Sequence, residues 1–138
     1  MKKIKDVMTR NVHLANPNQT IREAAGEMAK ADIGSLPVGE NDRLVGMITD
    51  RDIALRAVAK GRDAKTLVRE VMTDEIQYCF EDDDVTGVAE NMADLGVRRL
   101  PVLNHDKRLV GIVALSNVAN CGESKATSKL LKGVAAPH

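Results

Sequence analysis

The stretch LPVGENDRLVG at Leu36–Gly46 returns as LPVLNHDKRLVG at Leu100–Gly111, with one extra residue in its polar middle. An offset of 64 residues also carries the tripeptide VMT at Val7–Thr9 onto Val71–Thr73. Separated blocks that keep one register are not expected by chance, so the chain contains an internal duplication. We therefore expect one small structural unit to occur twice.

Each copy predicts the element order β-α-β-β-α. In the first copy, Thr20 followed by Glu23 is a capping-box pattern that opens a helix with one apolar face. In the second copy, Asp84 is the candidate N-cap of the matching helix. Both helices are expected to pack their apolar faces against a sheet.

A β-hairpin follows each of these helices. Two short apolar runs flank Gly39–Asp42 in the first copy, which predicts a hairpin with a loop of about four residues. A second helix is expected from near Asp50 to Gly61, and its counterpart from near Ser116. Because one such unit has only a marginal core, we expect an α/β (α+β) fold in which two repeats pack as a pseudo-two-fold pair.

The predicted domain limits follow from the repeat. They are residues 1–61 for the first repeat, 62–69 for a linker, 70–120 for the second repeat and 121–138 for a C-terminal tail. The tail shows no pattern that decides whether it is ordered.

Composition excludes several classes of function. The chain of 138 residues carries 20 basic and 20 acidic side chains, so phosphate neutralisation along a nucleic acid is not its main task. Aromatic residues make up 1% of the chain, too few for a stacking platform on single strands. No apolar run spans a bilayer, and the two cysteines form neither a disulfide framework nor a zinc motif. We expect a cytoplasmic protein without nucleic-acid or membrane partners.

The sharpest local signal is GMITDRDI at Gly46–Ile53, where a buried strand runs into a helix N-terminus. Unpaired N–H groups at such a terminus favour an anion such as phosphate, and the Thr49 hydroxyl adds a donor. The Asp52 carboxylate suits the vicinal hydroxyls of a ribose. The alternative is purely structural: Thr49 or Asp50 is an N-cap, and Asp52 complements the helix dipole.

At this point the sequence resembles the CBS domain family. The resemblance rests on two registered copies of a Met-Thr pair, a Leu-Pro-Val strand and the Gly46–Asp52 motif, and it spans about residues 4–120. Two tandem copies resemble a CBS pair, or Bateman module. The resemblance implies a regulatory module that binds an adenosine-containing ligand (AMP, ADP or ATP, with NAD or S-adenosylmethionine as further members of the class) between the repeats. It also implies a homodimer, a regulated partner protein, and no required cofactor.

The resemblance assigns site residues by position. Thr49 matches the hydroxyl that contacts phosphate, and Asp52 matches the carboxylate that binds ribose. Arg98 and Arg99 match basic positions that reach phosphate; because successive strand residues point to opposite faces, we expect only one of them to face the ligand. A solvated edge pair is the alternative for both arginines. The remaining positions matched to the nucleotide site are Val12, His13, Gly34, Ser35, Pro37, Asp50, Arg51, Tyr78 and Asn117.

The second copy departs from the motif. Ala114 stands where the first copy has Thr49, and Asn117 stands where it has Asp52. Loss of a hydroxyl and of a carboxylate charge weakens hydrogen bonding to a sugar phosphate. We therefore expect one competent site, organised by Thr49 and Asp52, and a second site that is weak or empty.

Other chemistry finds little support in the sequence. The run Glu81–Asp84 contains ligands for a divalent ion, but it also fits a solvated loop that leads to an N-cap. No nucleophile-base pair or metal-ligand spacing is present, so we do not expect an enzyme. Two hypotheses remain: a nucleotide-binding regulatory module, and a dimerising scaffold that regulates a partner without binding nucleotide.

Overall fold

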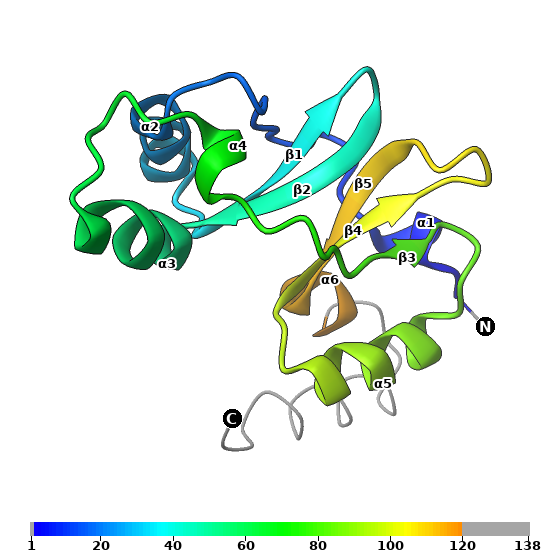
Figure 1. The fold of residues 1–138 in the computed structure, drawn as a ribbon. Coiled ribbons are helices and arrows are strands. Elements are labelled where there is room, and N and C mark those ends of the chain that lie inside the picture. Colours follow the sequence, from blue (N-terminus) through cyan, green and yellow to red (C-terminus); the bar gives the residue numbers. More distant parts are fainter. Residues whose placement is uncertain (1, 120–138) are drawn as a thin grey trace. The chain divides into compact units, whose positions relative to one another are not determined.

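The computed structural model describes residues 2–119. Within them the chain divides into two compact units (Figure 1). Residues 13–76 form one, here called the first-repeat unit. Residues 2–12 together with 77–119 form the other, the second-repeat unit. Both units mix helices with strands, which confirms the α+β class.

The first-repeat unit is built on a two-stranded hairpin. Its elements are α2 (Ile21–Ala31), β1 (Ser35–Glu40), β2 (Arg43–Thr49), α3 (Asp50–Asp52), the π-helical turn η1 (Ile53–Ala57), the 3-10 turn η2 (Val58–Lys60) and α4 (Val68–Val71). The first strand expected in this repeat is reduced to one parallel bridge between Ala15 and Val38. The predicted second helix ends at Gly61, which has a left-handed φ of 76°.

The second-repeat unit contains a three-stranded sheet in the order β3-β4-β5. Its elements are α1 (Ile4–Val7), β3 (Cys79–Phe80), α5 (Val85–Leu95), β4 (Arg99–Leu103), β5 (Leu109–Ala114) and α6 (Leu115–Ala119). Figure 1 shows the short helix α1 beside β3, although the two are far apart in the sequence. The order from β3 to α6 is the predicted β-α-β-β-α.

The two long helices, α2 and α5, occupy equivalent positions in the two repeats, but their N-terminal caps differ. In α2 the Glu23 N–H donates to Thr20 Oγ1 and the Thr20 N–H donates to Glu23 Oε1, both at 3.2 Å, which confirms the predicted capping box. Asp84 holds the N-cap position of α5, but its side chain makes no capping hydrogen bond. At the C-terminal ends, Asp32 and Gly96 take left-handed φ values of 55° and 67°.

The first hairpin has a tighter turn than expected. Gly39 and Glu40 belong to β1, so the connection consists of Asn41 and Asp42 alone rather than four residues. Both turn residues have positive φ, 54° and 64°, as a two-residue turn of type I′ requires. A turn of this type matches the right-handed twist of the flanking strands.

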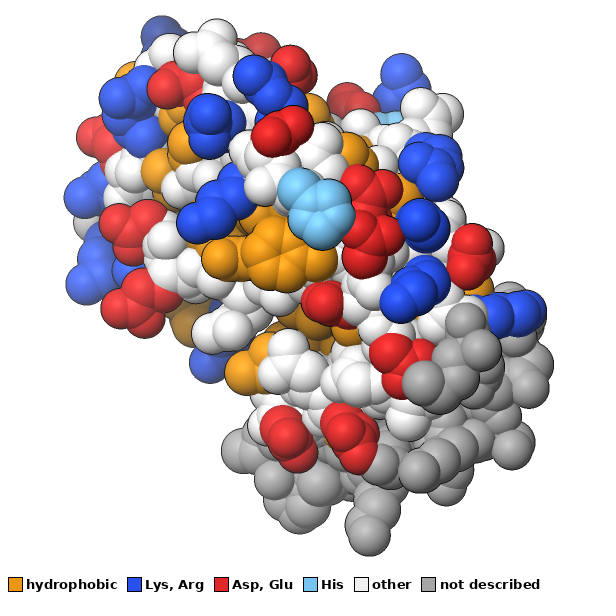
Figure 2. Space-filling model, turned by 90° about the vertical axis from the view of Figure 1, so that its right-hand side faces the viewer, with side chains coloured by type: hydrophobic (Ala, Val, Ile, Leu, Met, Phe, Trp, Pro, Cys, Tyr) orange, Lys and Arg blue, Asp and Glu red, His pale blue; other side chains and the backbone are white. Residues whose placement is uncertain are grey.

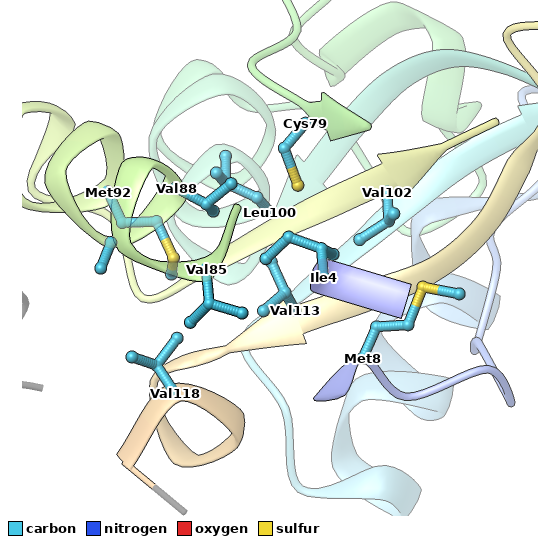
Figure 3. Close-up of a cluster of buried hydrophobic side chains, with 11 residues drawn as sticks. Ile4, Met8, Cys79, Val85, Val88, Met92, Leu100, Val102, Val113 and Val118 are labelled. Atoms are coloured by element: carbon cyan, nitrogen blue, oxygen red, sulfur yellow. The ribbon is translucent and has the colours of Figure 1, made fainter. Parts of the chain in front are cut away.

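Among residues 2–119, most buried side chains fall into two clusters, one in each unit. Figure 3 shows the cluster of the second-repeat unit, where Ile4 and Met8 pack among side chains of α5, β4 and β5. Cys79 belongs to this cluster, and burial raises the pKa of its thiol to about 12. A thiol held neutral in this way is unreactive, as expected for a structural cysteine.

Each unit is completed by the start of the other sequence copy. The Met72–Thr73 segment pairs with β2 through Met47, and the Thr9 backbone exchanges two hydrogen bonds with Ile112 of β5. Residues 62–69, predicted as a linker, also bond to the first-repeat unit: Thr66 and Ala64 accept backbone N–H groups from the start of α2. The boundaries of the sequence repeats and of the compact units therefore differ: the segment that opens each repeat belongs to the unit formed by the rest of the other repeat.

Charged side chains of both signs cover the surface. Figure 2 shows Lys and Arg side chains lying among Asp and Glu on the face drawn, in keeping with the formal net charge of zero. Among the large apolar side chains of residues 2–119, the exposed ones are Leu14, Leu55, Val58, Tyr78 and Leu95. Leu55 and Val58 lie on the helical turns that follow Asp52.

Candidate functional site

Thr49 and Asp52 form a closed local structure where β2 meets α3. The Asp52 N–H donates to Thr49 Oγ1 and the Thr49 N–H donates to Asp52 Oδ2, both at 3.0 Å. This confirms that Thr49 is an N-cap, the structural alternative left open by the sequence. The resemblance predicts that the same two residues contact phosphate and ribose, which requires atoms that these capping bonds leave unused.

The expectation of unpaired N–H groups at this helix start is wrong. The Asp50 N–H donates to the Gly34 carbonyl at 2.9 Å, and the Arg51 N–H donates to Asp50 Oδ1 at 2.8 Å. With the Asp52 N–H bonded to Thr49, the backbone donors of α3 are all used. An anion at this point has to be bound by side chains rather than by the backbone.

Side-chain groups suited to a sugar phosphate do remain. The Thr49 hydroxyl accepts the Asp52 N–H and keeps its own hydrogen to donate. Within residues 2–119, Asp52 Oδ1 makes no hydrogen bond, so it keeps its capacity to accept. Both side chains are half-buried. One donor and one carboxylate oxygen therefore lie within one helical turn.

The predicted residues Gly34 and Ser35 lie beside this turn. Ser35 is the direct cross-strand partner of Thr49. Directly opposite residues of an antiparallel pair point to the same face, so the Ser35 and Thr49 hydroxyls share a face. The neighbouring position, Gly34, faces the opposite side of the strand. A Cβ added there would lie 3.0 Å from Asp50 Oδ2.

The second-repeat unit keeps half of this arrangement. The Ala114 N–H donates to Asn117 Oδ1 at 2.7 Å, so Asn117 caps as Asp52 does, but Ala114 has no hydroxyl to return the bond. Arg99 is the cross-strand partner of Ala114, and the Arg98 carbonyl accepts the Leu115 N–H at 2.9 Å. The second repeat therefore presents arginines where the first presents Gly34 and Ser35.

The faces of the two arginines follow from this equivalence. Arg99 corresponds to Ser35 and is expected on the face that Thr49 occupies in its own repeat. Arg98 corresponds to Gly34 and is expected on the opposite face. Both side chains are exposed, and neither makes an ion pair within the part of the chain that the structure describes.

The other predicted positions are scattered over both units. His13 is exposed and contacts Glu27 at 3.1 Å, and Arg51 is exposed as well. Pro37 is buried in β1, and its carbonyl accepts the Ala15 N–H. Val12 and Tyr78 belong to the second-repeat unit. The rings of Tyr78 and Phe80 pack edge to face there, with their centroids 5.6 Å apart. Their role toward a ligand remains a prediction.

A groove of about 410 Å³ lies between α2 and α3, within the first-repeat unit. Its apolar lining consists of Ala25, Met28, Ala29, Ile33 and Ile53. Asp32 and Asp50 line it as well. The sequence interpretation missed Asp32. A comparison of charges between the two copies could have found it, because Gly96 replaces it in the second copy.

The acidic run Glu81–Asp84 serves local structure. Asp83 accepts the Phe80 N–H at 2.9 Å, and Asp82 contacts Lys5 at 3.1 Å and His105 at 2.5 Å. Among residues 2–119 no group of three or more His, Cys, Asp or Glu side chains could hold a metal ion. No helix in this described range is long and apolar enough to cross a membrane.

Comparisons with known proteins identify the family and the fold. The chain is 45% identical over 119 residues to the CBS domain-containing protein YhcV of Bacillus subtilis, covering 86% of this chain and 84% of that protein. The CBS domain pair of protein MJ0100, solved in complex with 5′-methylthioadenosine and S-adenosyl-L-methionine, superposes with a TM-score of 0.76 at 32% identity. This match covers 91% of this chain and 98% of that one.

A third protein, CBSX2 of Arabidopsis thaliana, was solved in complex with AMP. It superposes with a TM-score of 0.77 at 25% identity, over 90% of this chain and 98% of that one. The family model described as CBS domain matches twice, at residues 4–58 and 68–122. The chain belongs to the CBS domain family, of which it contains two tandem domains.

Proposed function

We propose that this protein is a non-catalytic regulatory module that binds an adenosine-containing nucleotide at Thr49 and Asp52. The observation that carries the proposal is the pair of unused groups on one helical turn: the Thr49 hydroxyl hydrogen and Asp52 Oδ1. Relatives of similar fold bind AMP, 5′-methylthioadenosine and S-adenosyl-L-methionine, which share an adenosine.

Each group has a distinct role toward the ligand. Asp52 Oδ1 accepts hydrogen bonds from the vicinal hydroxyls of the ribose, as acidic residues do in dinucleotide-binding folds. The Thr49 and Ser35 hydroxyls share a face and donate toward the phosphate. Arg99, which is exposed and which the resemblance matches to a basic position that reaches phosphate, supplies positive charge to the ligand. AMP, ADP and ATP all carry a ribose with vicinal hydroxyls and at least one phosphate, so each of them is a candidate ligand.

Binding is expected at one site in each chain. The second repeat has Ala114 in place of the Thr49 hydroxyl, and Asn117 bonds to the Ala114 N–H with its oxygen. Asn117 also lacks the charge that strengthens a hydrogen bond to a sugar. The equivalent position in the second repeat therefore binds weakly or stays empty.

The module acts as a homodimer whose arrangement a partner protein detects. Nucleotide shifts the population of arrangements only as far as it binds one of them better. Regulation of this kind needs no catalytic group, and the proposal predicts that pure protein turns over neither ATP nor AMP.

A scaffold that does not bind nucleotide is the second candidate. The mutual capping of Thr49 and Asp52 favours it, because both side chains already have a structural task. The two candidates differ in one measurable property, which is affinity for an adenine nucleotide.

Titration calorimetry with AMP, ADP, ATP, NAD and S-adenosylmethionine tests the proposal. Wild-type protein is expected to bind at least one of them with one site per chain. Asp52→Asn keeps the oxygen that caps the helix, as Asn117 does in the second repeat, and is expected to weaken binding about 5- to 150-fold. Asn117→Asp is the matched control and leaves the first site unchanged. Wild-type protein that binds none of the five ligands would overturn the nucleotide proposal and leave the scaffold as the candidate.

A further inference from the structure

The groove between α2 and α3 suits a side chain that carries a positive charge at the end of an apolar stem, such as lysine or arginine. Asp32 and Asp50, whose side chains are exposed, line the groove together with the apolar side chains. Neither carboxylate has an ion pair within residues 2–119. Asp32 also ends α2, where the helix dipole adds negative potential.

The second repeat provides a natural comparison. Its equivalents of the apolar lining are again apolar: Ala89, Met92, Ala93, Val97 and Val118. Gly96 and Leu115 replace the two carboxylates, and Arg98 replaces Gly34. The same region is therefore acidic in one repeat and basic in the other.

The comparison of the two repeats suggests Arg98 as the positively charged side chain that would occupy the groove. In the first repeat a side chain at the Gly34 position would point at Asp50, on the face away from Thr49. The Arg98 backbone makes the same hydrogen bond to the following helix, so its side chain is expected on that face too. Arg98 is thus free of the nucleotide role given to Arg99, and it is exposed without an ion pair in the described residues.

We propose that the groove between α2 and α3 receives the Arg98 side chain of a second copy of this chain. The inference rests on the homodimer proposed above and states its orientation: the first repeat of one chain lies against the second repeat of its partner. The methylene stem of arginine suits the apolar lining, and its planar guanidinium suits two carboxylates. In a two-fold dimer the contact occurs twice.

The opposite orientation is disfavoured by charge. If like repeats faced each other, Asp32 and Asp50 would lie against their own copies, and Arg98 would lie against Arg98. Like charges brought together at an interface oppose association. Pairing unlike repeats removes both repulsions.

Exposed apolar side chains on the adjoining segments of the chain also fit this contact. Leu55 and Val58 are 47% and 68% exposed on the helical turns that follow Asp50. Leu95, 37% exposed, ends α5 just before Arg98. A contact that buries such side chains gains from the hydrophobic effect as well as from charge.

Sedimentation equilibrium of charge-reversed variants tests the contact. Arg98→Glu and Asp50→Arg are each expected to raise the dimer dissociation constant at least about tenfold, and the double variant is expected to recover most of the loss. Arg99→Glu, the neighbouring charge reversal, is expected to leave the constant within about threefold of wild type. A dimer unaffected by Arg98→Glu, or a double variant no tighter than either single one, would overturn the contact.

Disulfide trapping separates the two orientations in a Cys121→Ser background. A mixture of Asp50→Cys chains and Arg98→Cys chains is expected to form the mixed disulfide dimer. Linkage of Asp50→Cys chains to one another would show that like repeats face each other and would overturn the proposal. Wild-type protein that stays monomeric overturns the homodimer together with this contact, whereas nucleotide binding is measured separately by calorimetry.

Discussion

Thr49 and Asp52 each bond to the other's backbone, with two hydrogen bonds of 3.0 Å that close the turn between β2 and α3. The equivalent pair in the second repeat, Ala114 and Asn117, keeps one of these bonds. One repeat thus has a complete capping box, and the other has half of one.

Thr49→Ala is therefore expected to lower the free energy of unfolding. The change leaves the Asp52 N–H without its acceptor, and loss of an N-cap side chain costs about 0.5–2 kcal/mol. Thr49→Ser, which keeps the hydroxyl, should remain within about 0.5 kcal/mol of wild type. Urea denaturation measures both; equal stability of the alanine and serine variants would show that the capping bond contributes nothing.

Gly46→Ala is expected to destabilise the first-repeat unit by about 1–3 kcal/mol. A Cβ at Gly46 would lie 2.7 Å from Met72 Sδ and 2.9 Å from the Thr73 carbonyl, and the carbonyl cannot move without breaking its strand pairing. Gly111→Ala should act alike, since its Cβ would lie 2.7 Å from Met8 Sδ and 2.8 Å from the Thr9 carbonyl.

Gly26→Ala is the matched control for these two changes. Gly26 lies within α2, and nothing lies within 4 Å of a Cβ added there. Since alanine favours a helix over glycine, this variant should gain up to about 1 kcal/mol. Thermal unfolding that shows no difference between Gly46→Ala and Gly26→Ala would contradict the close approach.

The sequence repeat predicted the elements whose signals are local. The Thr20–Glu23 capping box and the end of a helix at Gly61 depend on neighbours within a few residues, and both are present. The unpaired N–H groups expected at Asp50 and Arg51 are absent, because their acceptors are the Gly34 carbonyl and the Asp50 side chain. A local sequence pattern cannot predict that the Gly34 carbonyl, 16 residues earlier, comes within hydrogen-bonding distance of the Asp50 N–H.

The exchange of opening segments between the units could not be predicted either. The helices α1 and α4 have four residues each, too few for an apolar period. Their places are set by contacts distant in sequence, such as Ile4 N–H to the Asp83 carbonyl and Val68 N–H to the Gln19 carbonyl. A repeat identifies equivalent residues but not which copy each segment packs against.

Removal of residues 2–12 tests this exchange. The deletion takes the buried Ile4 and Met8 out of the second-repeat core, and it breaks the pairing of Thr9 with Ile112. The second-repeat unit should then unfold or lose amide protection, although all of residues 70–120 is still present. Hydrogen exchange that stays as slow in β4 and β5 as in wild type would contradict the prediction.

A single substitution keeps the test informative if the deleted chain is insoluble. Ile4→Ala is expected to cost about 2–5 kcal/mol, because a fully buried side chain is truncated. Ile4→Val should cost about 0.5–1.5 kcal/mol. Faster exchange should be confined to the second-repeat unit in both variants.

Lys5, Asp82 and His105 connect three segments of the second-repeat unit, and their contacts predict a pH dependence. Hydrogen bonding to Lys5 and then to His105 lowers the pKa of Asp82, and Asp82 raises the pKa of Lys5. A lowered carboxyl pKa contributes stability above the unfolded pKa, about 3.9, and loses it as pH falls through the folded pKa. A raised lysine pKa contributes stability below the unfolded value, about 10.4, and loses it as pH rises through the folded pKa.

Asp82→Asn removes both contributions at once. The stability difference between wild type and this variant should therefore be largest between the two pKa values, and it should shrink as pH falls toward the carboxyl pKa or rises toward the lysine pKa. Because the groups are exposed, salt should reduce the difference. Asp106→Asn, an exposed change in the β4–β5 loop, should show no such profile. Urea titrations across this pH range measure the difference, and one that does not change with pH would show that the Lys5–Asp82 pair makes no contribution in solution.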